Sequence, residues 1–330
     1  MKPINMAILG AGRIAVKMAS TIAGMTSVKP YAVASRDIGK AKEFADKNGI
    51  AKAYGSYRDM LGDPEVDLVY VATPHSHHHM HAKLCLEYGK HVLVEKAFTS
   101  DAAKARDIIA LAREKKLLVT EAMWTRYMPF SKTIREIVDS GAIGKPAALY
   151  ACLGYTNALW NKRIQRLELA GGALLDLGVY PINFAMMVFG NDIVDATAVC
   201  TKLPTGPDAQ ETMVLTYADN RLATLFASSI ASTDRRGIIY GDKGYLVVNN
   251  INNPQSAQLF DVDWQPGEKF TSLPQITGFE YEVEAAVKAI REGAIECPEM
   301  PHSETIRVLQ MMDSFRAKWG IEFPEPEADC

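Results

Sequence analysis

Residues 4–25 read INMAILGAGRIAVKMASTIAGM and place a Gly-x-Gly-x-x-Ala turn directly after a short apolar run. The run before the turn predicts a buried strand, and the apolar spacing after it predicts a helix. In such a turn, Gly10 permits the sharp bend, Gly12 leaves room for a pyrophosphate, and Ala15 lets the helix pack close to the sheet. The helix N-terminus then faces an anion. This stretch therefore predicts the start of a dinucleotide-binding βαβ unit.

Strand-like and helix-like segments continue to alternate through residues 1–122. Further strands are predicted at residues 30–34, 51–54, 67–72, 91–95 and 117–121, and helices at residues 37–48, 56–61, 77–88 and 101–116. Such alternation requires right-handed crossovers and a parallel sheet covered on both faces. We therefore expect an α/β Rossmann domain, with a doubly wound parallel sheet, over residues 1–122.

The pattern changes over residues 123–330, where strand-like runs follow one another through short polar turns. Strands are predicted at residues 147–153, 193–203, 211–217, 222–230, 237–240 and 245–248, and helices at residues 130–140, 171–189, 278–292 and 303–319. Consecutive strands with short turns indicate an antiparallel sheet. We expect an α+β C-terminal domain with a mostly antiparallel open sheet, whose last helix could pack back on the N-terminal domain.

Composition narrows the class of partner. The chain has 330 residues, 48% of them hydrophobic, and its 36 basic and 39 acidic side chains leave a net charge of −3. This balance predicts no broad attraction to nucleic acid or to an anionic membrane, and it favours a small-molecule partner. We find neither a signal-peptide pattern nor an apolar run of membrane-spanning length, so we expect a cytoplasmic protein. The scattered cysteines indicate neither a disulfide framework nor a zinc site; they are Cys85, Cys152, Cys200, Cys297 and Cys330.

The turn after the second predicted strand bears on the choice of cofactor. If that strand ends at Ala34, then Ser35 and Arg36 occupy the turn, where a hydroxyl and a guanidinium can bind a 2′-phosphate. Asp37 is then interpreted as the cap of the next helix, and NADP is favoured. A slip of two residues would instead place Asp37 on the ribose and make NAD the cofactor. Arg13 either pairs with the adenosine phosphate or is an ordinary exposed arginine.

A histidine-rich segment, TPHSHHHMH at residues 73–81, invites a metal interpretation. His77 and His81 are one helical turn apart and could share an ion. However, no carboxylate or cysteine lies close in sequence to complete the ligand set, and the segment follows a strand of the dinucleotide-binding sheet. We therefore expect no metal site here.

Four motifs in order resemble those of the glucose-fructose oxidoreductase, inositol dehydrogenase and rhizopine-catabolism (Gfo/Idh/MocA) family. They are the turn at residues 10–15, Ala-Thr-Pro-His at 72–75 with His78, Glu-Lys-Ala at 95–97, and GGALLDLGVY at 171–180. The segment EAMWTRYMP at 121–129 is similar to the branch containing dimeric dihydrodiol dehydrogenase and NADP-linked D-xylose 1-dehydrogenase. The resemblance implies an NAD(P)-dependent oxidoreductase acting on the CH–OH group of a sugar or trans-dihydrodiol. It also implies a homodimer or homotetramer assembled through the C-terminal sheet.

The resemblance further implies a catalytic set of Lys96, Asp176 and Tyr180. Asp176 and Tyr180 are four residues apart on one predicted helix and share a face, and Gly172 and Gly178 leave room for a group to approach it. In this hypothesis Tyr180 takes the proton of a substrate hydroxyl, and the Lys96 ammonium activates the phenol and binds the same oxygen while hydride goes to the nicotinamide. Asp176 orients the substrate or the lysine.

The sequence departs from the family pattern at two positions. Ala97 replaces the usual proline, which leaves the form of the peptide bond after Lys96 open, and Tyr180 stands where many members have histidine. The cofactor-binding residues implied by the resemblance are Gly10, Gly12, Arg13, Ile14, Ala15, Ser35, Arg36, Thr73, Pro74, His75, His78, Glu95 and Lys96. Candidates for an apolar wall around the substrate are Trp124, Tyr155 and Phe279, and the polar segment 157–166 is expected to overlie the pocket.

Two other functions remain open on the same scaffold. Some relatives keep the nucleotide bound and cleave glycosidic bonds by transient oxidation, so a redox-neutral NAD-dependent glycosidase is the first alternative. A non-catalytic nucleotide-sensing protein is the second, although a pure binding module has no need of Lys96, Asp176 and Tyr180 together. Net turnover of added NADP distinguishes the dehydrogenase from both.

Overall fold

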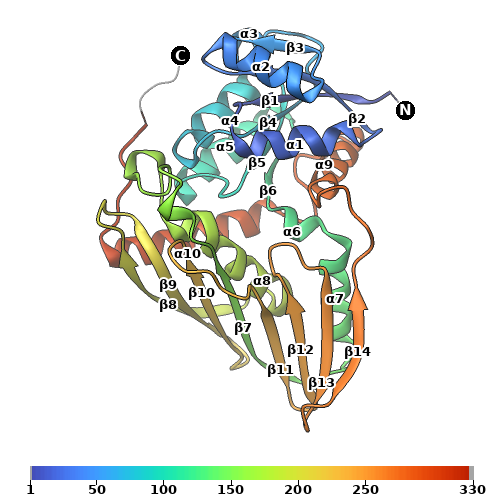
Figure 1. The fold of residues 1–330 in the computed structure, drawn as a ribbon, viewed down its shortest axis with the longest axis vertical. Helices are drawn as coiled ribbons and strands as arrows, with labels where there is room; N and C mark the ends of the chain where they lie inside the picture. Colours follow the sequence, from blue (N-terminus) through green and yellow to red (C-terminus); the bar gives the residue numbers. More distant parts are fainter. Residues whose placement is uncertain (1, 327–330) are drawn as a thin grey trace. The chain divides into compact units, whose positions relative to one another are not determined.

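The computed structural model describes residues 2–326 and divides into two compact units (Figure 1). Unit 1 comprises Met1–Tyr127, Gln275–Ile306 and Glu325–Cys330, and unit 2 comprises Met128–Pro274 and Arg307–Pro324. The first change of unit lies close to the predicted boundary at residue 122. Of the five cysteines named above, Cys330 lies outside the described residues.

Unit 1 is built on a six-stranded parallel sheet with the order β3-β2-β1-β4-β5-β6. Its strands are β1 (Ile4–Leu9), β2 (Val28–Ala34), β3 (Lys52–Tyr54), β4 (Leu68–Val71), β5 (His91–Glu95) and β6 (Val119–Ala122). Every residue of β1 is buried, as expected for a strand with helices on both faces. The doubly wound Rossmann fold predicted from the alternating pattern is confirmed.

The helices of unit 1 lie in pairs on the sheet: α1 packs with α2, and α4 packs with α5 (Figure 1). Their bounds are α1 (Arg13–Ala23), α2 (Ile38–Asn48), α3 (Tyr57–Leu61), α4 (His78–Glu87), α5 (Ala102–Lys115), α6 (Trp124–Tyr127) and α9 (Glu280–Glu292). A 3₁₀ turn over His75–His77 precedes α4. Side chains cap three of these helices, because Asp37, Ser56 and Asp101 accept hydrogen bonds from first-turn N–H groups.

The predicted second domain is not continuous, because residues 275–306 belong to unit 1 rather than unit 2. Thr277 shares a hydrogen bond of 2.6 Å with Thr21 of α1. The His302 Nε2 lies 2.7 Å from the Val119 carbonyl oxygen, and the Thr305 hydroxyl donates to Glu121. An amphipathic pattern shows that a helix packs but does not show against what, so the sequence alone does not assign residues 275–306 to unit 1.

Unit 2 contains an eight-stranded sheet with the order β14-β13-β12-β11-β7-β10-β9-β8. Its strands are β7 (Pro146–Gly154), β8 (Ile193–Lys202), β9 (Asp208–Tyr217), β10 (Leu222–Ser228), β11 (Gly237–Gly241), β12 (Gly244–Asn249), β13 (Ser256–Asp261) and β14 (Pro266–Thr271). The mostly antiparallel sheet predicted from the short turns is confirmed; β7 and β10 pair in parallel. The sequence missed β13 and β14, because β14 is exposed along nearly its whole length and carries no alternating apolar pattern.

Helices cover one face of this sheet, with α8 packed on β7 and β10 (Figure 1). The helices are α7 (Pro129–Asp139), α8 (Val179–Phe189) and α10 (His302–Trp319), which supplies residues to both units. Short 3₁₀ turns cover Asn157–Leu159 and Leu167–Leu169. The stretch Leu167–Phe189 is long and apolar enough to cross a membrane, but 94% of its most apolar window is buried inside the protein.

Candidate active site

The glycine turn after β1 has the backbone that the sequence motif requires. Gly10 has a φ of +104°, and a Cβ placed there would lie 3.1 Å from the Ala72 carbonyl oxygen, so backbone strain and a tight contact both disfavour a side chain. Gly12 begins α1 with an extended backbone and is exposed, while Ala15 is fully buried under the helix. The first-turn N–H groups of α1 are therefore open to an anion at the turn.

The turn after β2 resolves the role of Asp37. The strand ends at Ala34, Ser35 and Arg36 form the turn, and the Asp37 carboxylate accepts hydrogen bonds from the N–H groups of Gly39 at 2.8 Å and Lys40 at 3.2 Å. The interpretation of Asp37 as a helix cap is confirmed, and the two-residue slip does not occur. Arg36 is exposed beside this cap.

The histidine segment after β4 is mostly buried, and His78 makes hydrogen bonds to backbone carbonyl groups. The His78 Nε2 lies 2.8 Å from the Thr73 carbonyl oxygen, and its Nδ1 lies 2.9 Å from the Ala97 carbonyl oxygen. His75 packs edge-to-face on His78, with ring centroids 5.6 Å apart. Among residues 2–326, no group of three or more His, Cys, Asp or Glu side chains is arranged to hold a metal ion. His78 therefore connects the loop after β4 to the loop after β5.

The loop that carries Lys96 follows β5 and is held by two buried carboxyl groups. Glu95 accepts a hydrogen bond from the Lys96 N–H at 3.1 Å and a second from the Tyr70 hydroxyl. Glu121 accepts from the Phe98 N–H at 3.1 Å and from the Thr305 hydroxyl at 2.9 Å. The peptide bond between Lys96 and Ala97, left open by the sequence, is cis.

Burial changes the pKa of the Glu121 carboxyl group more than these hydrogen bonds do. The side chain is fully buried, and this desolvation raises the pKa of its carboxyl group to about 7, although the hydrogen bonds from Thr305 and Phe98 act in the opposite direction. The Lys96 loop therefore rests on a group that changes its protonation near neutral pH.

In unit 2, Asp176 and Tyr180 lie on consecutive helical elements. Asp176 belongs to a π-helical turn, Leu174–Gly178, and Tyr180 is the second residue of α8. The Asp176 carboxylate accepts hydrogen bonds from Asn157 Nδ2 at 2.7 Å and from an Arg163 guanidinium nitrogen at 2.5 Å. Sequence reasoning did not identify these partners individually; the available signal was the polar segment 157–166. The single helix predicted over residues 171–189 therefore begins with a π-turn, a feature frequent at functional sites.

The glycines of the same motif accommodate two carboxyl groups of β9. The backbone N–H of Leu174 donates to Asp208 at 2.5 Å, and a Cβ on Gly172 would overlap the Asp208 carboxyl group. A Cβ on Gly178 would lie only 2.6 Å from Glu211 Oε1. The groups that approach this helix are thus two buried acidic side chains of the protein itself.

The three candidates for the substrate wall lie in two environments. Trp124 and Phe279 of unit 1 pack on each other with ring centroids 4.6 Å apart, and the Lys17 ammonium lies 4.3 and 4.2 Å from those centroids. Both rings are buried, and they make a cation–π contact with Lys17. In unit 2 the Tyr155 hydroxyl accepts a hydrogen bond from Arg235 at 3.3 Å.

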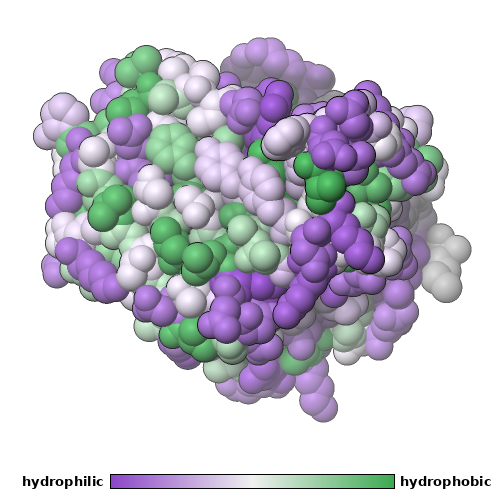
Figure 2. Space-filling view, turned by 90° about the horizontal axis from the view of Figure 1, so that it is seen from below, coloured by the Kyte–Doolittle hydropathy of each residue, from purple (hydrophilic) through white to green (hydrophobic). Residues whose placement is uncertain are grey.

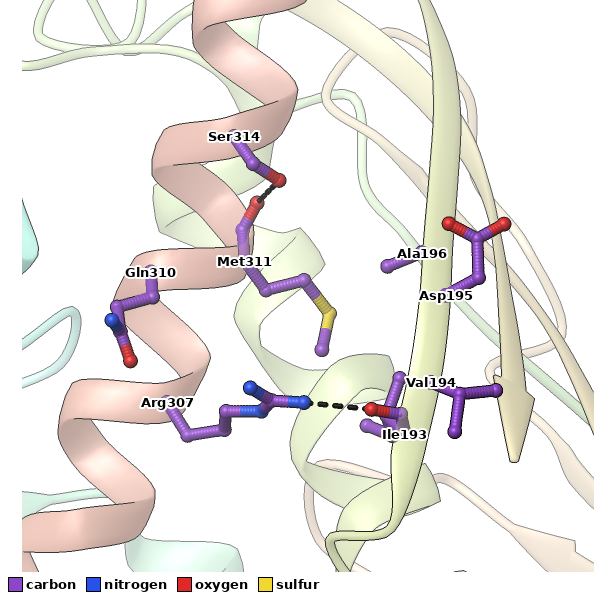
Figure 3. A pocket seen from close by; sticks show the side chains of 8 residues that line it. All are labelled: Ile193, Val194, Asp195, Ala196, Arg307, Gln310, Met311 and Ser314. Carbon is purple, nitrogen blue, oxygen red and sulfur yellow. Dashed lines mark hydrogen bonds between the residues drawn. The ribbon is translucent and has the colours of Figure 1, made fainter. Parts of the chain in front are cut away.

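A cavity of about 250 Å³ lies between β8 and α10 in unit 2 (Figure 3). Arg307 crosses it and donates a hydrogen bond of 2.8 Å to the Ile193 carbonyl oxygen. The lining residues are Ile193, Val194, Asp195, Ala196, Arg307, Gln310, Met311 and Ser314. None of the predicted site residues is among them.

Comparison with known families gives two matches that together cover most of the chain. The family described as "Oxidoreductase family, NAD-binding Rossmann fold" matches residues 4–123. The family described as "GFO/IDH/MocA C-terminal domain" matches residues 131–247.

Individual relatives give the same result. The chain is 32% identical to the trans-1,2-dihydrobenzene-1,2-diol dehydrogenase of Homo sapiens, over 89% of this chain and 90% of that protein. It is 33% identical to the D-xylose 1-dehydrogenase (NADP(+)) of Hypocrea jecorina, over 89% and 84%. The solved structure of KijD10, a 3-ketoreductase from Actinomadura kijaniata in complex with NADP and TDP-benzene, matches with a TM-score of 0.87 at 26% identity, over 96% and 97%. The chain therefore belongs to the Gfo/Idh/MocA family of NAD(P)-dependent oxidoreductases.

Proposed function

We propose that this oxidoreductase uses NADP to interconvert a hydroxyl group and a carbonyl group on a sugar or a trans-dihydrodiol. The names of the relatives support this substrate class, because they describe a dihydrodiol dehydrogenase, a xylose dehydrogenase and a ketoreductase. The relatives lend no support to the glycosidase or to the nucleotide-sensing alternative. The observation that carries the proposal is the motif set Lys96, Asp176 and Tyr180, because a binding module has no need of it.

Solved structures of a relative support the assignment of Lys96 and Tyr180. Structures of KijD10 variants in complex with NADP and TDP-benzene carry a replaced lysine or a replaced tyrosine. In that protein the two replaced residues are 84 positions apart, as Lys96 and Tyr180 are here. We take these two side chains as the acid/base pair of the reaction.

The proposed chemistry divides the work among three side chains. The bound nicotinamide supplies or accepts the hydride. Tyr180 exchanges a proton with the substrate oxygen, and the Lys96 ammonium donates a hydrogen bond to that oxygen and stabilises its negative charge. Asp176 holds Asn157 and Arg163 through its two carboxylate oxygens, and it thereby orders the polar segment in which they lie.

The preference for NADP rests on the turn after β2. Ser35 and Arg36 offer a hydroxyl and a planar guanidinium, the groups that suit a 2′-phosphate. The carboxylate that follows in sequence, that of Asp37, already accepts two backbone hydrogen bonds. We expect Arg36→Ala to lower kcat/KM with NADP about tenfold or more and to leave kcat/KM with NAD nearly unchanged. An unchanged NADP preference would remove the role of Arg36.

The acid/base assignment is tested with Lys96→Met and Tyr180→Phe. We expect kcat to fall by about 10²–10⁴-fold in each, and the Kd of NADP, measured by calorimetry, to stay within about threefold of the wild type in Tyr180→Phe. Lys104→Met and Tyr88→Phe serve as matched controls outside the motifs. Near-native rates in both Lys96→Met and Tyr180→Phe would show that the pair is wrong.

The substrate is sought in a panel of aldoses, inositols and trans-diols, read by absorbance of the reduced nicotinamide.

A homo-oligomer assembled through the sheet of unit 2 is part of the proposal. Tyr245 stacks on Phe260 with ring centroids 4.9 Å apart, Tyr240 lies beside them at 6.0 Å, and Trp264 is 75% exposed. Apolar and weakly polar residues gather on the face seen in Figure 2. Such aromatic surface is typical of interfaces. We expect light scattering to give the molar mass of a dimer or tetramer, and Phe260→Glu to lower that mass. A monomeric wild type would rule out the proposed homo-oligomer.

A further inference from the structure

The buried face of β9 carries two acidic side chains in place of hydrophobic ones. Met213, Leu215 and Tyr217 point into the core of unit 2, and Glu211 continues the same row at 1% exposure. Among residues 2–326, neither carboxyl oxygen of Glu211 has a hydrogen-bond partner. Burial, reinforced by the negative charge of Asp208, raises the pKa of Glu211 well above its usual range.

Both acidic side chains of β9 contact the backbone of the π-helical turn. Asp208 accepts from the Leu174 N–H at the first residue of the turn. Glu211 lies against Gly178 at its last residue, so closely that a Cβ there would lie 2.6 Å from its Oε1. Asp176 lies between these two contacts, and Tyr180 follows two residues after the second.

A requirement for stability does not explain Glu211. A buried carboxyl group without a partner costs free energy, and an apolar side chain of similar size at such a position is often neutral or stabilising. A π-turn, by contrast, has a wider backbone than an α-helix and persists only where its surroundings hold it. Asp208 and Glu211 contact the turn at its two ends.

We propose that Glu211 is a positioning residue for the reaction: together with Asp208 it fixes the shape of the turn at residues 174–178 and so the directions of Asp176 and Tyr180. This inference rests on the proposed function, because its effect on rate is measured with the proposed oxidoreductase activity. The contacts themselves are independent of it.

The decisive variant is Glu211→Met, which keeps the length of the side chain but removes the planar carboxyl group that contacts Gly178. We expect the melting temperature to stay equal or to rise, kcat to fall about 10–100-fold, and the Kd of NADP to stay within about threefold. Glu211→Gln keeps the shape and a polar end and is expected to retain at least half of kcat. Leu215→Ala, on the same face of β9, is the matched control and is expected to lower the melting temperature with kcat nearly unchanged.

Gly178→Ala tests the same contact from the other side and does not depend on how Glu211→Met folds. Its Cβ displaces the Glu211 carboxyl group, so we expect a similar loss of kcat. In the double variant Gly178→Ala with Glu211→Ala that overlap is gone, and kcat is expected to be no lower than in Glu211→Ala alone. Unchanged kcat in Glu211→Met, or in Gly178→Ala, overturns the proposal.

Hydrogen exchange separates this proposal from the proposed function. We expect amides of residues 174–180 to exchange faster in Glu211→Met than in the wild type, with peptides of β1 and β5 unchanged. That result supports the role of Glu211 in shaping the turn even if the wild type turns over no substrate, which would count against the proposed function alone. Unchanged exchange at 174–180 overturns the role of Glu211.

Discussion

The loop that carries Lys96 and the turn that carries Asp176 are both built over buried acidic side chains, but they are held differently. In unit 1, Glu95 and Glu121 accept hydrogen bonds from the N–H groups of Lys96 and Phe98. In unit 2, Glu211 holds the turn through close contact with a glycine. The first arrangement is sensitive to loss of a hydrogen-bond acceptor, and the second to addition of a single methyl group.

The largest effect is expected for Gly172→Ala, which tests whether unit 2 depends on close contact. Gly172 has a φ of +109° and its Cβ would overlap Asp208, so strain and overlap act together. We expect the free energy of unfolding, measured with urea, to fall by about 3–5 kcal/mol. Gly141 has a φ of +77° with nothing near its Cβ, so Gly141→Ala should cost only about 1 kcal/mol. Equal costs would contradict the contact argument.

The next largest effect is expected for Asp176→Asn. This change weakens the pairing of Asp176 with Arg163 and leaves the contacts of Asp208 and Glu211 with the turn in place. The amide keeps the shape but loses the charge that pairs with Arg163, so we expect kcat/KM to fall about 10–100-fold with NADP binding unchanged. Asp219→Asn removes the charge of an exposed Asp–Arg pair and serves as the control. If the two variants behave alike, the Asp176 pairing has no part in the reaction.

A smaller effect, with a defined pH dependence, is expected for Glu121→Gln in unit 1. Because burial raises the pKa of this carboxyl group from 4.5 to about 7, the folded protein holds the proton more tightly than the unfolded chain. Its stabilising contribution is therefore full below about pH 4.5 and is lost as the pH rises through about 7. The amide keeps an acceptor for Phe98 and does not titrate.

We accordingly expect wild type to lose about 2 kcal/mol of unfolding free energy between pH 5 and pH 8 that Glu121→Gln does not lose. Urea titrations at a series of pH values measure this difference. Glu136→Gln, at an exposed position of α7, is the control. A wild type and a Glu121→Gln variant with parallel pH profiles would contradict the buried titration.

The smallest effect is expected for Asp37→Ala. The Asp37 side chain caps the N-terminus of α2, whereas Glu95 and Glu121 hold a loop. Loss of the cap should lower the free energy of unfolding by about 1 kcal/mol. The ratio of kcat/KM with NADP to that with NAD should not change. A marked shift in that ratio would mean that Asp37 contacts the cofactor.

The sequence predicted the parts of the molecule that depend on local pattern. The turn at Gly10 and the cap at Asp37 were read correctly, because each is determined by a few neighbouring residues. The partners of Asp176 and the positions of Asp208 and Glu211 were not predicted. A carboxyl side chain in a strand pattern reads as exposed, and only the folded sheet shows that this row of β9 faces inward.

Unit 1 is completed by a segment that the ribosome synthesises late. The Val119 carbonyl oxygen and the Glu121 carboxyl group have partners at His302 and Thr305, more than 180 residues further along the chain. A nascent chain that has released only its first 127 residues therefore leaves these groups of β6 uncovered. A fragment that ends at residue 127 would lack the same two partners, His302 and Thr305. In the full chain, unit 1 is complete only after most of unit 2 has been synthesised.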